Sequence, residues 1–564
     1  MIAKIETVKG LPTITVNGEP IAEMAYITYR PEHNHYSDFA KIGVKLYSVN
    51  LNFSEMPINE KAPVLVFQKG IFEREEPDFS IVDKNFDQIL EACPDAYIFP
   101  RVNMNLPESW EKAHPDELCE KGYNERKRFS YASDAWAEEV KRELVLLVNY
   151  IENSKYKDRV IGYQLAAGNT EEWLPIDPQS GYGPRAKEKF LLYCEDNGVE
   201  KNAESYYNFM SELIASRITD LAAEVKRLTD RTKLVGTFYG YVLLGRFVCH
   251  HALGQLIRCE DVDFLCSPAS YMDERAPGID PYSQVPPASL RHHGKLYFSE
   301  NDIRTHLSRY VHDHPNYTKP VWLGQEKPIA AEQLKLSFCR AMLYGYGMWW
   351  FDMWGGWYDD PTYMALMKKM KALCQDGMDS PDADLAVFMD EKAMPKGDPR
   401  GSGLVLKCLR EIGLCGTPHD LYLASDFDGV FDRYRACIFI EPAATELVDA
   451  CVEKAVAAGK AVKRISVEAM PKGLSPADRN AWLDANIFAE ELRKWLCDSG
   501  CEVAVNRKAV VYRGERFIML YTPEDGEYDF CDKGKKSFVD VFRGERIDFP
   551  VHLKKATCLL FERN

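Results

Sequence analysis

The sequence predicts an α/β protein in which a (β/α)8 TIM barrel is followed by a flavodoxin-like α/β domain and a small antiparallel β domain. Three observations lead to this prediction. Between residues 20 and 380, short apolar strands alternate with amphipathic helices over eight units. A shorter alternation of the same kind begins after Ser380, and from Cys501 onward apolar residues recur at every second position. Eight units in one stretch favour a closed barrel, whereas period two is typical of antiparallel strands.

The eight barrel strands are expected where apolar runs of strand length lie between helical patterns. They cover residues 24–29, 44–53, 96–104, 160–165, 233–241, 262–267, 295–298 and 347–351. Apolar residues at helical spacing predict helices at residues 36–42, 85–92, 135–153, 203–228, 330–343 and 361–373. Because the carboxyl ends of barrel strands surround one mouth, polar side chains at these ends are expected to form a site.

The rest of the chain divides into two smaller domains. In the first, strands are expected at residues 383–389, 419–423, 436–440 and 460–466, with helices at 402–412 and 444–458. No Gly-x-Gly-x-x-Gly follows its first strand, which argues against nucleotide binding. In the second, strands are expected at residues 503–505, 509–512, 517–520, 537–542 and 557–561. The predicted domains are therefore residues 1–380 (the barrel with a short N-terminal β extension), 381–500 (flavodoxin-like) and 501–564 (β-sandwich-like).

The composition limits the classes of partner. The formal net charge of −16 argues against nucleic acid and against anionic membranes, whereas a neutral carbohydrate is compatible with it. No apolar run approaches the roughly 18–20 residues of a membrane span, and the N-terminus lacks the apolar core of a signal peptide. The 16 cysteines include no Cys-x-x-Cys, which indicates reduced thiols. We therefore expect a cytoplasmic protein; a periplasmic protein whose leader had been removed would show the same features.

Acidic residues follow two of the predicted barrel strands. Glu300 follows residues 295–298 after a single serine, and Glu171 and Glu172 follow residues 160–165. Such a pair suits glycosidic bond cleavage, in which one carboxylate attacks the anomeric carbon and a carboxylic acid about 5–5.5 Å away protonates the leaving oxygen. We expect Glu300 to be the nucleophile. Glu172 is preferred as the acid/base because the adjacent Trp173 offers apolar cover that would raise its pKa, and Glu171 is the alternative.

Other polar and aromatic residues at the strand ends are candidates for sugar binding. They are Arg101, Asn103, Asn169, Tyr271, Asp352, Trp354 and Trp357. Aromatic faces pack on the C–H faces of sugar rings, and amide or carboxylate groups bind the hydroxyls. Tyr271 could also hold the nucleophile by a hydrogen bond. Structural roles are the alternatives for some of them: a barrel cap for Arg101 and Asn103, ordinary loop packing for Tyr271, and a core cluster for Trp354 and Trp357.

No metal and no cofactor are expected. His292 and His293 are adjacent, so their side chains point in different directions, and no third ligand has suitable spacing. The sequence also lacks His-Glu-x-x-His, Gly-x-Ser-x-Gly and a Walker loop.

Several segments together resemble a known family. They are Leu-Pro-Glu-Ser-Trp at 106–110, His-Pro-Asp-Glu-Leu at 114–118 with Gly122, Arg126 and Arg128, Val-Ile-Gly-Tyr-Gln at 160–164, and Leu-Tyr-Phe-Ser-Glu at 296–300. The chain resembles the family 42 β-galactosidases and their relatives in the clan of retaining (β/α)8 glycosidases. The resemblance implies that the fourth strand leads to the acid/base and that the seventh ends in the nucleophile. It also implies that the second domain is similar to the family's trimerisation domain, hence a homotrimer. The family usually has Asn-Glu directly at the end of the fourth strand, whereas here residues 168–173 intervene.

The first hypothesis is an exo-acting retaining β-glycosidase, β-galactosidase-like, that removes terminal sugars from oligosaccharides by double displacement. A β-mannosidase or another β-glycosidase of similar architecture is an alternative. A second class is a catalytically silent carbohydrate-binding protein on the same fold. A third is a metal-dependent lyase or isomerase on a barrel.

Overall fold

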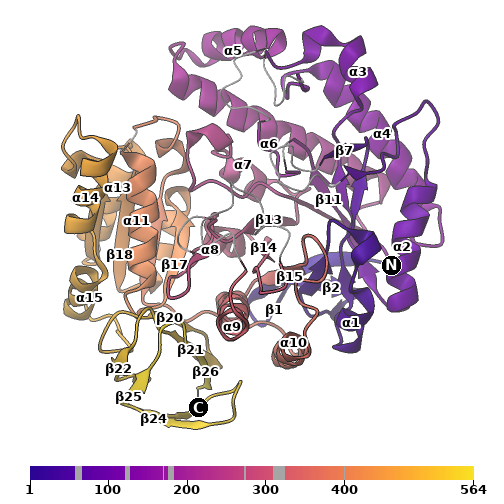
Figure 1. Ribbon diagram of the computed structural model, residues 1–564. Helices are drawn as coiled ribbons and strands as arrows, with labels where there is room; N and C mark the ends of the chain where they lie inside the picture. The colour runs from indigo at the N-terminus through magenta and orange to yellow at the C-terminus, as the bar shows by residue number, and fades with distance from the viewer. Residues whose placement is uncertain are drawn as a thin grey trace.

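The computed structural model describes residues 1–57, 67–120, 127–168, 170–175, 183–271, 275–308, 324–398 and 400–563. Its largest part is a ring of parallel strands surrounded by helices (Figure 1). The strands are β4 (Met24–Ile27), β5 and β6 (Leu46–Tyr47 and Asn50–Asn52), β9 and β10 (Tyr97–Ile98 and Arg101–Asn103), β11 (Gly162–Ala166), β12 (Leu234–Thr237), β13 (Phe264–Pro268), β14 (Leu296–Asn301) and β15 (Gly347–Phe351). All eight predicted barrel strands are thereby confirmed.

The strand pairing closes the ring. The second and third barrel strands are each interrupted, so that β5 and β6 form one strand and β9 and β10 form the next. β5 pairs with β4 and β9, while β6 pairs with β10 and β10 with β11. At the other end of the series β15 pairs with β4. The eight strands therefore make a (β/α)8 TIM barrel, in which polar residues at the strand ends face one mouth.

Helices cover the outside of the barrel. The predicted ones are present as α1 (Tyr36–Lys41), α2 (Ser80–Ala92), α4 (Asp134–Glu152), α6 (Ala203–Leu228), α9 (Lys327–Tyr344) and α10 (Pro361–Leu373). Four helices of this part were not predicted: α3 (Glu108–Ala113), α5 (Pro184–Asn197), α7 (Leu253–Arg258) and α8 (Pro287–His292). Side-chain caps start the two longest of these helices: Ser133 accepts from the N–H of Trp136 at α4, and Asn202 accepts from that of Ser205 at α6.

An antiparallel sheet at the N-terminus lies against the opposite end of the barrel. It consists of β1 (Ala3–Val8), β2 (Leu11–Val16) and β3 (Glu19–Pro20). The N–H of Ala3 donates to the carbonyl of Thr232, just before β12, and the N–H of Ile14 donates to Glu23, just before β4. Both contacts are at the amino ends of barrel strands. The N-terminal sheet therefore lies away from the mouth, which is at the carboxyl ends of the strands.

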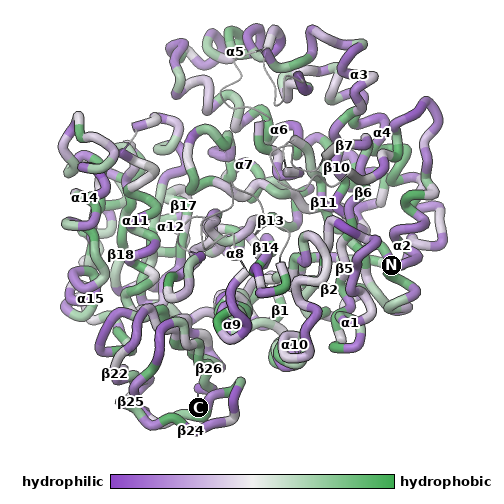
Figure 2. The backbone as a smooth tube through the Cα atoms, in the orientation of Figure 1, coloured by the Kyte–Doolittle hydropathy of each residue, from purple (hydrophilic) through white to green (hydrophobic). Residues whose placement is uncertain are grey.

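The chain continues into an open parallel sheet and then into antiparallel hairpins. The parallel sheet has the order β17-β16-β18-β19, built from β16 (Leu385–Met389), β17 (His419–Leu423), β18 (Ala436–Glu441) and β19 (Ala461–Ser466). Its helices include α11 (Gly401–Gly413), α12 (Phe427–Val430), α13 (Glu446–Ala457), α14 (Pro476–Asn486) and α15 (Ala489–Asp498). Apolar segments are concentrated around β18 and α11 (Figure 2). This is the predicted flavodoxin-like unit, although no bounds were predicted for α14 and α15.

The C-terminal unit is built on a three-stranded antiparallel sheet. Its strands are β20 (Val510–Arg513), β21 (Phe517–Tyr521) and β26 (Cys558–Glu562). Two further strand pairs join β22 (Gly526–Tyr528) to β25 (Val551–Leu553) and β23 (Ser537–Val539) to β24 (Arg546–Asp548). The prediction of a strand at 503–505 is wrong, because only Val505 forms an isolated bridge there, to Phe530. Segments as short as this one do not give a reliable two-residue alternation of apolar side chains in the sequence.

Both smaller units pack directly on the barrel. Arg291 in α8 forms an ion pair with Asp420 in β17 at 2.8 Å, and the N–H of Leu423 donates to the hydroxyl of Ser289 at 2.8 Å. On the other side, the N–H of Gly278 donates to the hydroxyl of Tyr521 at 2.8 Å. Polar contacts of this kind hold the loops around β13 and β14 against the later units.

Gly162 provides a test of strand pairing in the barrel. A Cβ atom at this position would lie 2.5 Å from the carbonyl oxygen of Leu234 in the neighbouring strand β12. We expect Gly162→Ala to lower the stability by about 1–3 kcal/mol, because the two strands must move apart. Thermal unfolding measures the effect. The matched control is Gly403→Ala in α11, where a Cβ would meet only Leu483, at 3.4 Å, and where alanine favours the helix. Equal unfolding temperatures for the two variants would contradict the close approach of β11 and β12.

Candidate active site

The guanidinium group of Arg101 joins two acidic residues at the mouth of the barrel. Arg101 is in β10, Glu300 is in β14, and Glu171 is in the turn after β11. One terminal nitrogen of Arg101 lies 3.5 Å from Glu171 Oε2, and the other lies 3.3 Å from Glu300 Oε2. All three side chains are at most 2% exposed. Carboxylates from the fourth and seventh barrel strands are therefore brought to one buried position.

The turn that carries Glu171 and Glu172 has an unusual backbone. Thr170, Glu171 and Trp173 have φ angles of 56°, 65° and 58°. Side chains of L-residues disfavour this left-handed region, at a cost of roughly 1–2 kcal/mol for each residue. Trp173 anchors the turn: its backbone N–H donates to Ala167 at 2.8 Å, and its indole N–H donates to Leu165 at 3.0 Å. Backbone strain held in this way is common at functional sites.

Glu171 is surrounded by hydrogen-bond donors. The side-chain N–H2 of Asn50 lies 2.7 Å from both of its carboxylate oxygens, and that of Asn103 lies 3.0 Å from Oε1. Burial raises the pKa of Glu171 to about 7, against the opposing effects of Arg101 and the two amides. Because these partners have only N–H groups to offer, the site favours the ionised form of Glu171 over a proton donor.

Glu172 has hydroxyl partners instead. Tyr241, in the loop after β12, donates from its hydroxyl to Glu172 Oε1 at 2.7 Å, and the hydroxyl of Thr170 donates to Oε2. Burial, together with a smaller effect of the charge of Glu300, raises the pKa of Glu172 to about 8. Of the two neighbouring glutamates, Glu172 is therefore the one that retains a proton at higher pH.

Glu300 lies between a cation and a tyrosine. Its Oε2 contacts Arg101, and the hydroxyl of Tyr271 donates to its Oε1 at 3.2 Å. Burial raises its pKa to about 7; Arg101 lowers it and the charge of Asp302 raises it. Tyr271 and Arg101 both donate to a carboxylate, so together they favour its ionised form.

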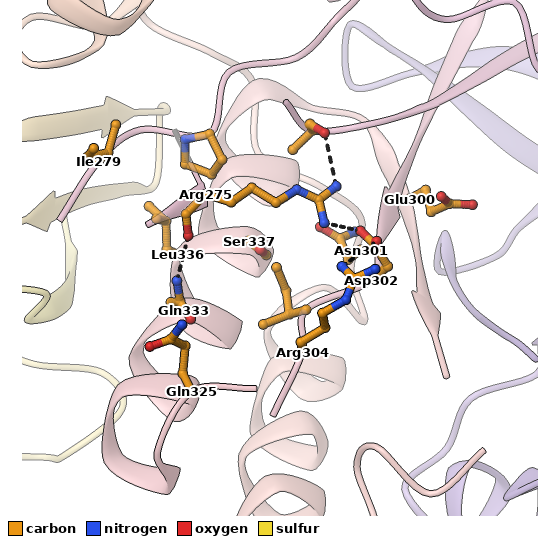
Figure 3. A pocket seen from close by; sticks show the side chains of 13 residues that line it. Arg275, Ile279, Glu300, Asn301, Asp302, Arg304, Gln325, Gln333, Leu336 and Ser337 are labelled. Carbon is orange, nitrogen blue, oxygen red and sulfur yellow. Dashed lines mark hydrogen bonds and ion pairs between the residues drawn. The ribbon is translucent and has the colours of Figure 1, made fainter. Parts of the chain in front are cut away.

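A buried charge network lies behind Glu300 (Figure 3). Asp302 forms ion pairs with Arg275 and, at 3.2 Å, with Arg304. Arg275 also donates to the carbonyl oxygens of Ser270 at 2.7 Å and Ala269 at 2.9 Å. Asp302, the two arginines and Ala269 line a cavity from which the carboxylate of Glu300 points away. The network therefore fixes the loop after β13, which carries Tyr271.

Asp352 holds a loop together by its contacts with the protein. Its carboxylate accepts from the hydroxyl of Tyr26 at 2.9 Å and from the N–H groups of Gly356 at 2.9 Å and Trp357 at 2.8 Å. These donors engage both of its oxygens, so Asp352 ties β4 to the loop after β15. Loop geometry of this kind depends on the tertiary fold, so the sequence alone did not reveal it.

The two tryptophans of this loop differ in their surroundings. Trp357 is fully buried and packs against the guanidinium of Arg304, 5.3 Å from its ring centre. Trp354 lies beside Tyr29, with 6.0 Å between ring centres, and its indole N–H has no hydrogen-bond partner within the described part of the chain. The indole N–H of Trp357 likewise has no hydrogen-bond partner among the described residues. Asn169, the remaining candidate, lies outside the described residues.

Three residues at the site were not predicted. Asn50 contacts Glu171, Tyr241 contacts Glu172, and the hydroxyl of Tyr29 lies 3.5 Å from Arg101. Each lies within or at the end of a predicted strand, so its position at the mouth was foreseeable. The signal for Asn50 was that it is a polar residue inside the otherwise apolar second strand.

The described residues offer no metal site: they contain no group of three or more His, Cys, Asp or Glu side chains arranged to hold an ion. Within the same residues, no helix combines the length and apolar character needed to cross a membrane.

The fold is shared with solved glycoside hydrolases. A β-galactosidase from Bacillus circulans sp. alkalophilus matches with a TM-score of 0.64 at 11% identity, over 97% of this chain and 99% of that one. A family 42 β-galactosidase from G. stearothermophilus matches with a TM-score of 0.64 at 9% identity, over 99% of this chain and 100% of that one. A family 42 exo-carrageenase from Bacteroides ovatus matches with a TM-score of 0.60 at 12% identity, over 100% and 86%.

Sequence comparison gives no such match: no protein-family model and no curated protein matches the chain. At sequence identities of 9–12%, the structural matches show the fold alone. They extend over nearly the whole chain, so the barrel, the parallel sheet and the C-terminal β unit occur together in these proteins as well. The resemblance to the family 42 β-galactosidases is thereby confirmed at the level of the fold, and the chain has a glycoside hydrolase fold.

Proposed function

We propose that the protein is an exo-acting retaining β-glycosidase that removes terminal sugars from oligosaccharides. The observation that carries this proposal is the shared contact of Arg101 with acidic residues from the fourth and seventh barrel strands, at 3.5 Å and 3.3 Å. The β-galactosidases and the exo-carrageenase with the same fold support a carbohydrate substrate and exo action. A silent binding protein would have no need for two buried carboxyl groups with raised pKa values.

The proposed reaction begins with Glu300 as the nucleophile. Its carboxylate attacks the anomeric carbon while the bond to the leaving oxygen breaks, and Glu172 gives its proton to that oxygen. Arg101 and Tyr271 keep Glu300 ionised and oriented before the attack. The result is a covalent glycosyl–enzyme.

The second half releases the sugar. Glu172, now ionised, removes a proton from a water molecule, whose oxygen attacks the anomeric carbon and displaces Glu300. Each of the two steps inverts the anomeric carbon, so the released sugar keeps its original configuration. Glu171 stays ionised and holds Arg101, Asn50 and Asn103 in place.

Replacing the nucleophile tests the proposal most directly. Glu300→Ala should lower kcat by more than about 10³-fold, because the covalent step is lost. Activity is measured on a panel of aryl β-glycosides, β-galactosides included. The matched control is Glu143→Gln: Glu143 is a buried glutamate in α4 whose pKa is also raised to about 8 by burial, and it should leave activity intact. Wild-type rates in Glu300→Ala would remove Glu300 from the mechanism.

Azide rescue distinguishes the two neighbouring glutamates. In Glu172→Ala, the glycosyl–enzyme formed from an activated aryl glycoside lacks its base, so added azide should attack it and restore turnover. Glu171→Ala should show no rescue, since Glu171 only supports Arg101 and the amides. Detection of a β-glycosyl azide confirms the product. Rescue in Glu171→Ala but not in Glu172→Ala would reverse the assignment.

The pH dependence follows from the two catalytic pKa values. Activity should rise as Glu300 ionises near pH 7 and fall as Glu172 loses its proton near pH 8. The profile of kcat/KM should therefore be a narrow bell between these limbs. In Glu172→Gln the alkaline limb should disappear on an activated substrate that needs no acid. If that limb persisted in the variant, a different group would be the acid.

A further inference from the structure

A buried histidine next to the site has no part in the reaction described above. His250 lies in the loop after β12 and is fully buried. Its ring stacks on that of Tyr239 at 4.2 Å and lies 5.9 Å from that of Tyr241, with an interplanar angle of 25° in both pairs. It therefore lies beneath the tyrosine that binds Glu172.

The hydrogen bonding of His250 defines its tautomer. Its Nδ1 accepts from the backbone N–H of Tyr241 at 3.2 Å, so the proton is on Nε2. Burial, together with a smaller effect of the neighbouring His251, lowers the pKa of His250 to about 3, so the ring is neutral. The backbone of Glu172 and Trp173 faces the ring. Within the described part of the chain, Nε2 forms no hydrogen bond of normal geometry.

Tyr239 gives this histidine a rigid support. Its hydroxyl lies 3.1 Å from the carbonyl oxygen of Ser211 and 3.3 Å from that of Cys249, and it accepts from the N–H of Ala252 at 3.1 Å. The ring on which His250 stacks is thus tied to α6 and to both sides of its own loop. A neutral imidazole on such a support can set the position of the residue it binds.

The histidine and Glu172 are connected through Tyr241. The backbone N–H of Tyr241 binds His250 at 3.2 Å, and its hydroxyl binds Glu172 at 2.7 Å. The turn that carries Glu172 has a strained backbone, with residues 170, 171 and 173 at positive φ. We propose that His250 is a positioning residue for the acid/base, which it orients through Tyr241. This inference rests on the proposed function, because it takes Glu172 as the acid/base.

The groups around the ring limit other interpretations. The titratable side chains that face it are Tyr239, Tyr241 and His251, whereas Glu172 faces it with its backbone. Lys392 approaches His251 and not His250. A histidine that only filled space would affect stability, whereas one that orients Tyr241 must affect proton transfer by Glu172.

Leaving-group dependence separates these two roles. Substrates with poor leaving groups need the acid, whereas 2,4-dinitrophenyl glycosides hardly do. His250→Ala should lower kcat/KM on a phenyl β-galactoside by about 10–100-fold and on the 2,4-dinitrophenyl β-galactoside by less than about 3-fold. If another sugar is the better substrate, the same pair of leaving groups is used on it. His250→Asn should recover most of the activity, since its amide oxygen can accept from Tyr241.

Two controls keep the test independent of folding and of the proposed function. His251→Asn changes an equally buried neighbour and should show the wild-type ratio between the two substrates. Crystal structures of His250→Ala and the wild type report the Tyr241–Glu172 hydrogen bond directly, without any activity.

The outcomes are distinct. A wild-type protein with no activity on any aryl β-glycoside would overturn the proposed function. The inference alone would be overturned by an active wild type from which His250→Ala differs no more than His251→Asn does, with the Tyr241–Glu172 bond retained. A changed leaving-group ratio, together with a displaced Tyr241, would support it.

Discussion

The buried guanidinium of Arg101 is the interaction on which the polar end of the barrel depends. It is 1% exposed and contacts Glu171 and Glu300 at the same time. Removing an ion from water costs several kcal/mol even inside a real protein, and close opposite charges must offset that cost. Here one cation offsets two carboxylates, while the rings of Phe238, Trp349 and Phe351 pack around it at 5.5–5.7 Å. Burial keeps both pKa values near 7, and Arg101 prevents them from rising further.

Two adjacent glutamates acquire different chemistry from their surroundings. Glu171 is met by amide and guanidinium N–H groups, which favour its charge, whereas Glu172 is met by hydroxyl groups and by the repulsion of Glu300. The left-handed backbone of the turn directs the two side chains to these separate environments. The strained backbone therefore goes together with two different roles. Glu171 supports the cation Arg101, and Glu172 holds a proton.

The likeness to solved glycoside hydrolases and the site geometry are independent observations. Coverage of nearly the whole chain at about 10% identity shows that the packing of the barrel, the parallel sheet and the C-terminal unit tolerates almost complete replacement of side chains. The proposed chemistry depends on far fewer atoms. It rests on contacts among about six side chains at the mouth, where a displacement of 1 Å matters. Loops fixed by Asp352 and by the Arg275–Asp302 pair supply that accuracy.

Local pattern in the amino-acid sequence determined the eight barrel strands, most of the long helices and the placement of Glu300, Tyr271 and the two glutamates at strand ends. Periodicity and strand ends are properties of neighbouring residues, so they can be recognised without a fold. Only the tertiary structure brought Asn50 to Glu171, from 121 positions away, and Tyr241 to Glu172, from 69 positions away. It also showed that Asp352 ties Tyr26 to the loop after β15 and that His250 lies beneath Tyr241. Such contacts depend on strand register, tilt and loop geometry, which are set by the packing of the whole barrel and not by any one segment of the chain.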